Sequence, residues 1–149
     1  MNTQFIELIR VWKSHPLLVE LDVSVTELSP GRALLTLTRN TTNVAGVRNS
    51  INGGVQAAVA EIAAHLATST LLEQGDQIEF TQDLSISYLY SVRATTTLID
   101  AKVLRQGRLT VVDVEILVGD EDEDSGRLNA KVRVTCSLGR RPSKSVVTK

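Results

Sequence analysis

The sequence predicts a single α+β domain in which an antiparallel sheet of about six strands curls around one long buried helix. In several separate segments, apolar residues alternate with polar ones, which is the pattern of half-buried strands. Residues 51–72 are apolar nearly all the way round a helix, as expected of a buried one. The length of 149 residues suits one core, which we place at residues 1–139, with residues 140–149 as a polar, disordered tail.

The N-terminal third of the chain predicts a short helix followed by a hairpin. Residues 5–12 place their apolar side chains on one helical face, and Pro16 ends that helix. Residues 19–26 alternate as a first strand, Gly31 marks a turn, and residues 33–37 continue as a second strand.

After the long helix, which we expect to stop at Gly75, four more strand patterns follow. They lie around residues 84–88, 99–103, 112–118 and 130–138. Short turns between consecutive strands favour an antiparallel meander. The order helix, two strands, long helix, four strands describes the hotdog architecture. Its open sheet edge and exposed helix face require a second subunit, so we expect a homodimer or homotetramer.

Composition excludes several classes of function. The formal net charge of −1 shows no excess of positive charge, so nucleic-acid binding is not expected. A single cysteine, Cys136, excludes an intramolecular disulfide and a cysteine-cluster metal site, and its strand pattern predicts a buried thiol. The acidic residues 121–126 lack the calcium-loop spacing and predict a solvated hairpin tip, so no metal is expected. Without a signal-peptide pattern or a membrane-length apolar stretch, we expect a cytoplasmic protein that does not bind membranes.

The start of the long helix carries a family resemblance. Residues 51–61, Ile-Asn-Gly-Gly-Val-Gln-Ala-Ala-Val-Ala-Glu, closely resemble the signature of PaaI-like hotdog acyl-CoA thioesterases. In that family a His-Gly-Gly opens the helix, and an acidic residue follows nine positions after the His. Residues 83–89, 103–108 and 126–130 resemble further segments of the family, so the similarity spans about residues 17–138.

This resemblance implies hydrolysis of an acyl-CoA thioester to a free acid and coenzyme A. It assigns the oxyanion donor to the Gly53 amide and the base or nucleophile to Glu61, with Asn52 at the position of the family's His. Gly54 would let the substrate approach the backbone closely. Gly53 and Glu61 lie eight residues apart, or about 12 Å along a helix, which is too far to serve one carbonyl. We therefore expect a site across the dimer interface.

Three further residues complete the candidate set. His65, one turn after Glu61, could orient that carboxylate or transfer a proton, or it could simply pack at the interface. Thr81 matches a polar site residue of some relatives, and is otherwise an ordinary strand threonine. Arg108 could contact the phosphates of coenzyme A, and is otherwise a solvated charge.

One position departs further from the family pattern. The side-chain amide that some relatives carry six residues before the family's His falls here on Gly46, with Asn43 and Asn49 as the nearby alternatives.

Two rival functions stay open at this point. One is a non-catalytic hotdog protein that binds an acyl-CoA or another small ligand, in which Glu61 holds a partner group and Gly53 serves packing. The other is an enoyl-thioester hydratase or dehydratase, since those enzymes pair an acidic residue with a histidine such as His65. None of these functions implies a resident cofactor, because coenzyme A enters as part of the substrate.

Overall fold

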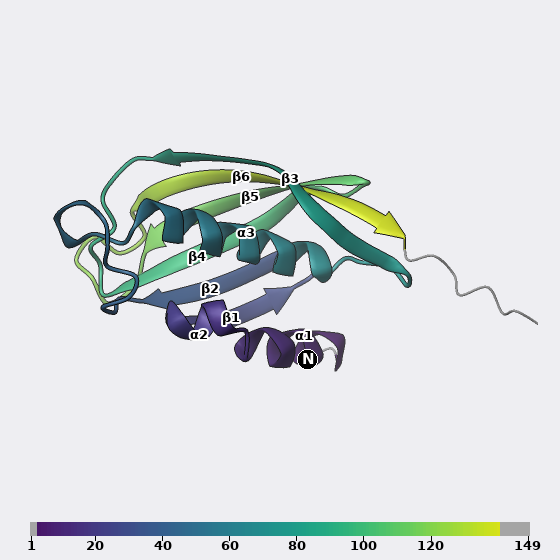
Figure 1. Ribbon diagram of the computed structural model, residues 1–149, viewed down its shortest axis with the longest axis horizontal. Helices are drawn as coiled ribbons and strands as arrows, with labels where there is room; N and C mark the ends of the chain where they lie inside the picture. Colours follow the sequence, from purple (N-terminus) through teal and green to yellow (C-terminus); the bar gives the residue numbers. More distant parts are fainter. Residues whose placement is uncertain (1–2, 141–149) are drawn as a thin grey trace, which may run out of the picture.

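The computed structural model describes residues 3–140, which form a curled antiparallel sheet with one long helix across its concave face (Figure 1). The elements in chain order are α1 (Thr3–Lys13), α2 (Pro16–Glu20), β1 (Val23–Ser29), β2 (Arg32–Thr38), the 3-10 turn η1 (Val47–Asn49), α3 (Gly53–Ser69), β3 (Asp76–Tyr88), β4 (Thr96–Arg105), β5 (Leu109–Val118) and β6 (Leu128–Arg140). The strand order is β1-β2-β4-β5-β6-β3, and every neighbouring pair is antiparallel. The predicted hotdog architecture is confirmed.

The core lies between α3 and the sheet. The helix contacts β2 through β6, and its inward side chains are small, so the strands can approach it closely. The buried apolar residues of α3 are Val59, Ala60, Ile62, Ala63, Ala64, Leu66 and Ala67. Cys136 on β6 is fully buried in this core, as predicted. Within residues 3–140, no helix has the length and apolar character needed to cross a membrane.

The first predicted strand begins later than its alternating pattern suggests. Residues 16–20 form the short helix α2, because Pro16 suits a first helical turn and the Nδ1 of His15 accepts a hydrogen bond from the Leu17 N–H at 3.2 Å. Leu18 on this helix is buried in the core. The strand therefore starts only at Val23, and the prediction of strand over residues 19–22 is wrong.

The predicted meander is correct for β4, β5 and β6 and wrong for β3. Strand β3 pairs with β6 at the far edge of the sheet, whereas β4 lies beside β2, with Leu35 opposite Ile99. Helix α3 carries the chain across the concave face, so the strand after it joins the opposite edge (Figure 1). One edge of the sheet is consequently β3, a strand of 13 residues.

Two predicted boundaries also shift. Helix α3 begins at Gly53 and ends at Ser69, inside the predicted range of 51–72. Strand β6 continues to Arg140, which pairs with Asp76 of β3, so residue 140 belongs to the sheet rather than to the tail. The remaining tail, residues 141–149, lies outside the described residues.

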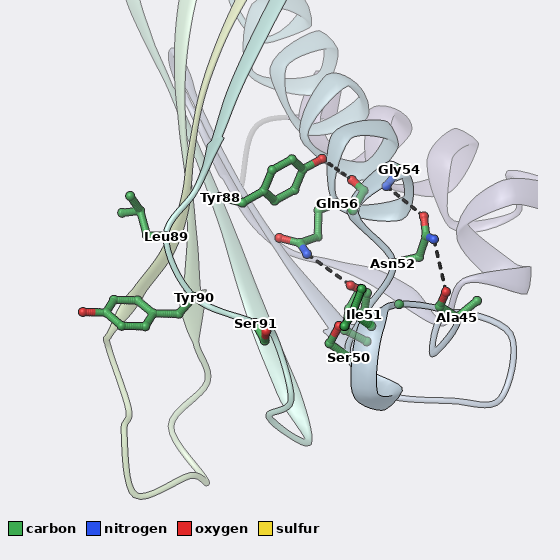
Figure 2. Close-up of a pocket in the computed structure, with 13 residues that line it drawn as sticks. Ala45, Ser50, Ile51, Asn52, Gly54, Gln56, Tyr88, Leu89, Tyr90 and Ser91 are labelled. Atoms are coloured by element: carbon green, nitrogen blue, oxygen red, sulfur yellow. Dashed lines mark hydrogen bonds between the residues drawn. The ribbon is translucent and has the colours of Figure 1, made fainter.

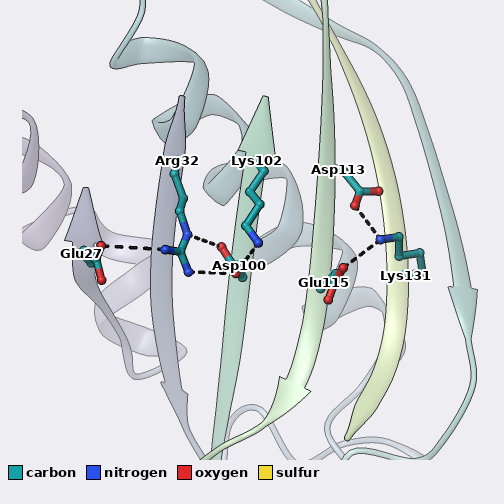
Figure 3. A network of polar contacts seen from close by, with 7 residues as sticks. All are labelled: Glu27, Arg32, Asp100, Lys102, Asp113, Glu115 and Lys131. Atoms are coloured by element: carbon teal, nitrogen blue, oxygen red, sulfur yellow. Dashed lines mark hydrogen bonds and ion pairs between the residues drawn. The ribbon is translucent and has the colours of Figure 1, made fainter. Parts of the chain in front are cut away.

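The outer face of the sheet carries a network of charged side chains (Figure 3), here called the outer charge network. Its members are Glu27, Arg32, Asp100, Lys102, Asp113, Glu115 and Lys131. The Arg32 guanidinium donates to both oxygens of Asp100 at 2.9 and 3.0 Å, and the Lys131 ammonium donates to Asp113 and Glu115 at 2.5 and 3.0 Å. Burial raises the pKa of Asp100, but the hydrogen bonds and positive charges of Arg32 and Lys102 together outweigh burial and hold that pKa below its ordinary value.

Candidate functional site

The Asn52 side chain caps the N-terminal end of α3. Asn52 occupies the N-cap position, and its Oδ1 accepts hydrogen bonds from the N–H groups of Gly54 at 2.8 Å and Val55 at 3.3 Å. Such a cap satisfies donors that have no partner inside the helix. Of the first three N–H groups of α3, only that of Gly53 does not bond to Asn52. The helix thus keeps one donor at its positive end.

A cavity of about 510 Å³ opens at this end of the helix (Figure 2). Three segments line it, namely the loop before the helix, the first helical turn, and the chain that leaves β3. They contribute residues 45–47, 50–54, 56 and 88–91. Three residues of the predicted site, Asn52, Gly53 and Gly54, therefore lie together in one cavity wall.

Tyr88, at the end of β3, lies directly against Gly53. Its hydroxyl donates a hydrogen bond to the Gly53 carbonyl at 2.6 Å. A Cβ added to Gly53 would lie 3.1 Å from that hydroxyl and 3.2 Å from the ring carbon that bears it. A larger residue at position 53 would thus make the Tyr88 side chain shift by a few tenths of an ångström. Sequence reasoning missed this role of Tyr88, because the only local signal was its place in a strand pattern.

The outward side of α3 is a half-exposed stripe that includes Ala57, Glu61, His65 and Ser69. Their spacing of four residues places them on one helical face. The Glu61 carboxylate forms no hydrogen bond or ion pair within residues 3–140. Gly53 and Glu61 belong to the same straight run of α3, so about 12 Å of helix separates them within one chain.

The structure brings together two residues of the predicted site, His65 and Thr81. The Nε2 of His65 and the Oγ1 of Thr81 are 2.7 Å apart, which joins α3 to β3. Burial lowers the pKa of His65 below its ordinary value, and the opposing charge of Glu61 does not overcome this. The imidazole is consequently neutral at pH 7 and bonded to a neighbouring strand.

Arg108 lies apart from Asn52, Gly53 and Gly54 within one chain. It lines a separate cavity of about 230 Å³ together with Glu73, Asp76 and Gln106. The Gln106 side chain donates to the Leu71 carbonyl at 3.2 Å, so this cavity is at the C-terminal end of α3. The 17-residue helix is about 25 Å long, which separates Arg108 from Gly53 in a single subunit.

The loop before α3 has no side-chain amide at the family's position. A Cβ at Gly46 would meet the Ser50 hydroxyl oxygen at 2.6 Å, so this loop cannot hold a larger residue there as it is folded. Asn43 is fully buried, and its amide nitrogen donates to the carbonyls of Leu21 and Thr38 at 3.0 and 2.9 Å. Asn49 is exposed and does not line the cavity.

An amide does reach the cavity from a residue that sequence reasoning passed over. Gln56 is 6% exposed, lines the cavity, and donates from its Nε2 to the Ile51 carbonyl at 3.2 Å. The available signal was a long polar side chain in the first turn of an otherwise apolar helix.

The acidic loop, residues 121–126, connects β5 and β6, and its aspartates bond to nearby loop residues. Asp122 accepts from the Thr95 N–H at 3.1 Å, and Asp124 pairs with Arg127 at 2.8 Å. Among residues 3–140, no cluster of three or more His, Cys, Asp or Glu side chains is arranged to hold a metal ion.

Comparison with known proteins decides the family. The sequence model of the thioesterase superfamily matches residues 48–126, which include α3, Glu61 and the strands β3 to β5. The chain belongs to the thioesterase superfamily. This thioesterase-family chain is 36% identical over 113 residues to a protein of Saccharolobus solfataricus named "Putative esterase", an alignment that covers 74% of each chain.

Solved structures agree on the fold of this superfamily member. A thioesterase from Haemophilus influenzae superposes with a TM-score of 0.82 at 20% identity, covering 97% of this chain and 96% of that one. A thioesterase family protein from Silicibacter pomeroyi superposes with a TM-score of 0.81 at 19% identity, covering 92% and 99%. Together, the family match and the esterase relative support thioester hydrolysis as the general activity.

Proposed function

We propose that this protein hydrolyses an acyl-CoA thioester to a free acid and coenzyme A. The site would combine Glu61 of one subunit with the Gly53 N–H of its partner in a homodimer, or in a tetramer built from such dimers. The observation that carries the proposal is the Asn52 cap, which bonds to Gly54 and Val55 and leaves the Gly53 N–H at the cavity.

The chemistry follows from these two groups. Glu61 takes a proton from water, and the hydroxide adds to the thioester carbon. The carbonyl oxygen becomes an oxyanion, which the Gly53 N–H and the positive helix end stabilise. The carbon–sulfur bond then breaks, and the thiolate of coenzyme A recovers the proton. Direct attack by the Glu61 carboxylate, followed by hydrolysis of the resulting anhydride, would use the same two groups.

A two-subunit site is supported by the position of Glu61. Its carboxylate has no partner within residues 3–140 and lies on the half-exposed stripe of α3, where a second helix can pack. Two antiparallel copies of α3 can bring Glu61 of one to the first turn of the other, whereas one straight helix cannot. The same pairing brings the C-terminal end of the partner's helix toward the cavity, where the partner subunit's Arg108 could contact coenzyme A phosphate.

The geometry gives less support to a hydratase. That reaction would need Glu61 and a histidine at one carbon, but His65 bonds to Thr81 and its pKa is lowered by burial. Binding without catalysis is the outcome that the experiment below is designed to detect.

The test has two parts. First, a panel of aliphatic and aromatic acyl-CoAs is assayed for release of free thiol, and hydrolysis of none of them refutes the proposed activity. Second, inactive Glu61→Gln and Gly53→Pro chains are mixed, unfolded and refolded together. About a quarter of wild-type activity should return, because half of the dimers are mixed and each holds one intact site. No recovery would place both groups in the same subunit.

A further inference from the structure

The amide of Gln56 has one atom without a partner. Its Nε2 donates to the Ile51 carbonyl, so the other terminal atom is the oxygen, and this Oε1 is buried without any hydrogen bond. The orientation of the amide is fixed by that contact, because a carbonyl can only accept. A buried acceptor left unpaired is unfavourable, and its presence in a native fold calls for an explanation.

The residue that carries the unpaired oxygen lines the cavity at the N-terminal end of α3. Gln56 lines that cavity, and its oxygen points to the side where Tyr88 and Leu89 lie (Figure 2). Gln56 is 6% exposed, so its amide is already largely desolvated before any ligand enters. A ligand that offers an O–H group there would satisfy the acceptor.

The position of Gln56 limits where that O–H can be on a substrate. Gln56 follows Gly53 by three residues, and its amide reaches back to the Ile51 carbonyl, so the amide and the Gly53 N–H lie at the same end of α3. If the thioester carbonyl oxygen bonds to the Gly53 N–H, a hydroxyl two carbons beyond the carbonyl carbon lies within reach of the Gln56 oxygen. An unsubstituted acyl chain would instead place a methylene group beside it.

We infer that Gln56 selects thioesters whose acyl group carries a hydroxyl at carbon 3. This inference rests on the proposed function, since it uses the Gly53 N–H as the carbonyl site. Within that function it names the substrate class, 3-hydroxyacyl thioesters, and the group that recognises it.

The experiment compares matched substrates that differ only in this hydroxyl. The pairs are butyryl-CoA with 3-hydroxybutyryl-CoA, and lauroyl-CoA with 3-hydroxylauroyl-CoA. We expect wild type to favour the hydroxylated member of a hydrolysed pair by about ten- to hundredfold in kcat/KM. Two variants separate the acceptor from the packing of the side chain. Gln56→Met removes both the acceptor and the donor to Ile51, whereas Gln56→Glu keeps an acceptor and, when protonated, a donor to the Ile51 carbonyl.

The expected result is a preference ratio near one in Gln56→Met and a retained preference in Gln56→Glu, whatever their absolute rates. Equal rates on both members of a pair in wild type would overturn the inference while leaving the thioesterase proposal intact. A preference that survives in Gln56→Met would overturn it too, because the hydroxyl would then be recognised elsewhere. Absence of hydrolysis with the wider acyl-CoA panel would instead refute the proposed function itself.

Discussion

Polar groups on the outer face of the sheet differ from those at the N-terminal end of α3. In the outer charge network every carboxylate has a cationic partner, as when Asp100 pairs with both Arg32 and Lys102. At the helix end and along its outward stripe, the Glu61 carboxylate and the Gln56 oxygen have no partner within residues 3–140. Paired charges stabilise the fold, whereas the unpaired Gln56 oxygen, on a residue that lines the cavity, and the unpaired Glu61 carboxylate, on the half-exposed stripe, are available for a substrate or a second subunit.

The largest difference in activity should appear when a glutamate in each region is replaced by glutamine. Glu61→Gln is expected to lower kcat by about a hundredfold to ten-thousandfold, because the base is lost while the shape is kept. Glu115→Gln, in the outer charge network, should leave kcat unchanged and cost less than about 1 kcal/mol, since the pair is substantially exposed. Thiol-release kinetics and urea unfolding of both variants measure the contrast. Equal activities would contradict the role assigned to Glu61.

The next largest effect should come from removing the free N–H of Gly53. Gly53→Pro removes the N–H at a first helical position where proline is tolerated, and the extended backbone of Asn52, with φ −57° and ψ 136°, suits a following proline. Gly53→Ala is the matched control, because it keeps the N–H and also adds a Cβ against Tyr88. We expect kcat of the proline variant to be about a hundredfold to a thousandfold below that of the alanine variant.

If the two variants lose activity equally, contact with Tyr88 rather than the N–H is responsible. Circular dichroism on both proteins checks that the helix is intact.

The outer charge network should respond through stability alone. Asp100→Asn leaves Arg32 with only the longer contact to Glu27 at 3.9 Å, and we expect a loss of about 1–2 kcal/mol in the free energy of unfolding, moderated by the solvent exposure of Arg32. Denaturant unfolding measures the loss. The turnover of the folded protein should be unchanged, and a fall in kcat at full occupancy of the folded state would link this face to the site.

The smallest effect concerns His65 and pH. Burial holds its folded-state pKa below the ordinary 6.5, so the unfolded chain binds a proton more readily as the pH falls. The free energy of unfolding of wild type should therefore drop as the pH is lowered through 6.5, and His65→Gln should drop less. Urea unfolding at about pH 7.5 and about pH 5.5 tests this. Asp100 does not interfere, since its lowered pKa places its effect below its ordinary 3.8.

Local sequence patterns predicted most elements because alternation and helical periodicity report which face of an element is buried. The helix from Gly53 and the strands β2, β4, β5 and β6 all follow such patterns. The prediction of a strand over residues 19–22 was wrong because Pro16 and His15 favour a helical turn there. An alternating pattern does not reveal such a turn. The sequence did not predict that β3 pairs with β6. That pairing depends on where the chain emerges from α3, which is not a local property.

The sequence alone was enough to predict the fold class, the family resemblance and the candidates Asn52, Gly53 and Glu61, because a helix start and its buried face are encoded within one short segment. The folded structure was needed to show that Tyr88 packs on Gly53 and that His65 bonds to Thr81. It also showed that Arg108 lies at the other end of α3 and that Gln56, which lines the cavity, holds an unpaired oxygen. Each of these facts joins segments distant in the chain or depends on which partner a side chain finds, and spacing along one segment cannot supply it.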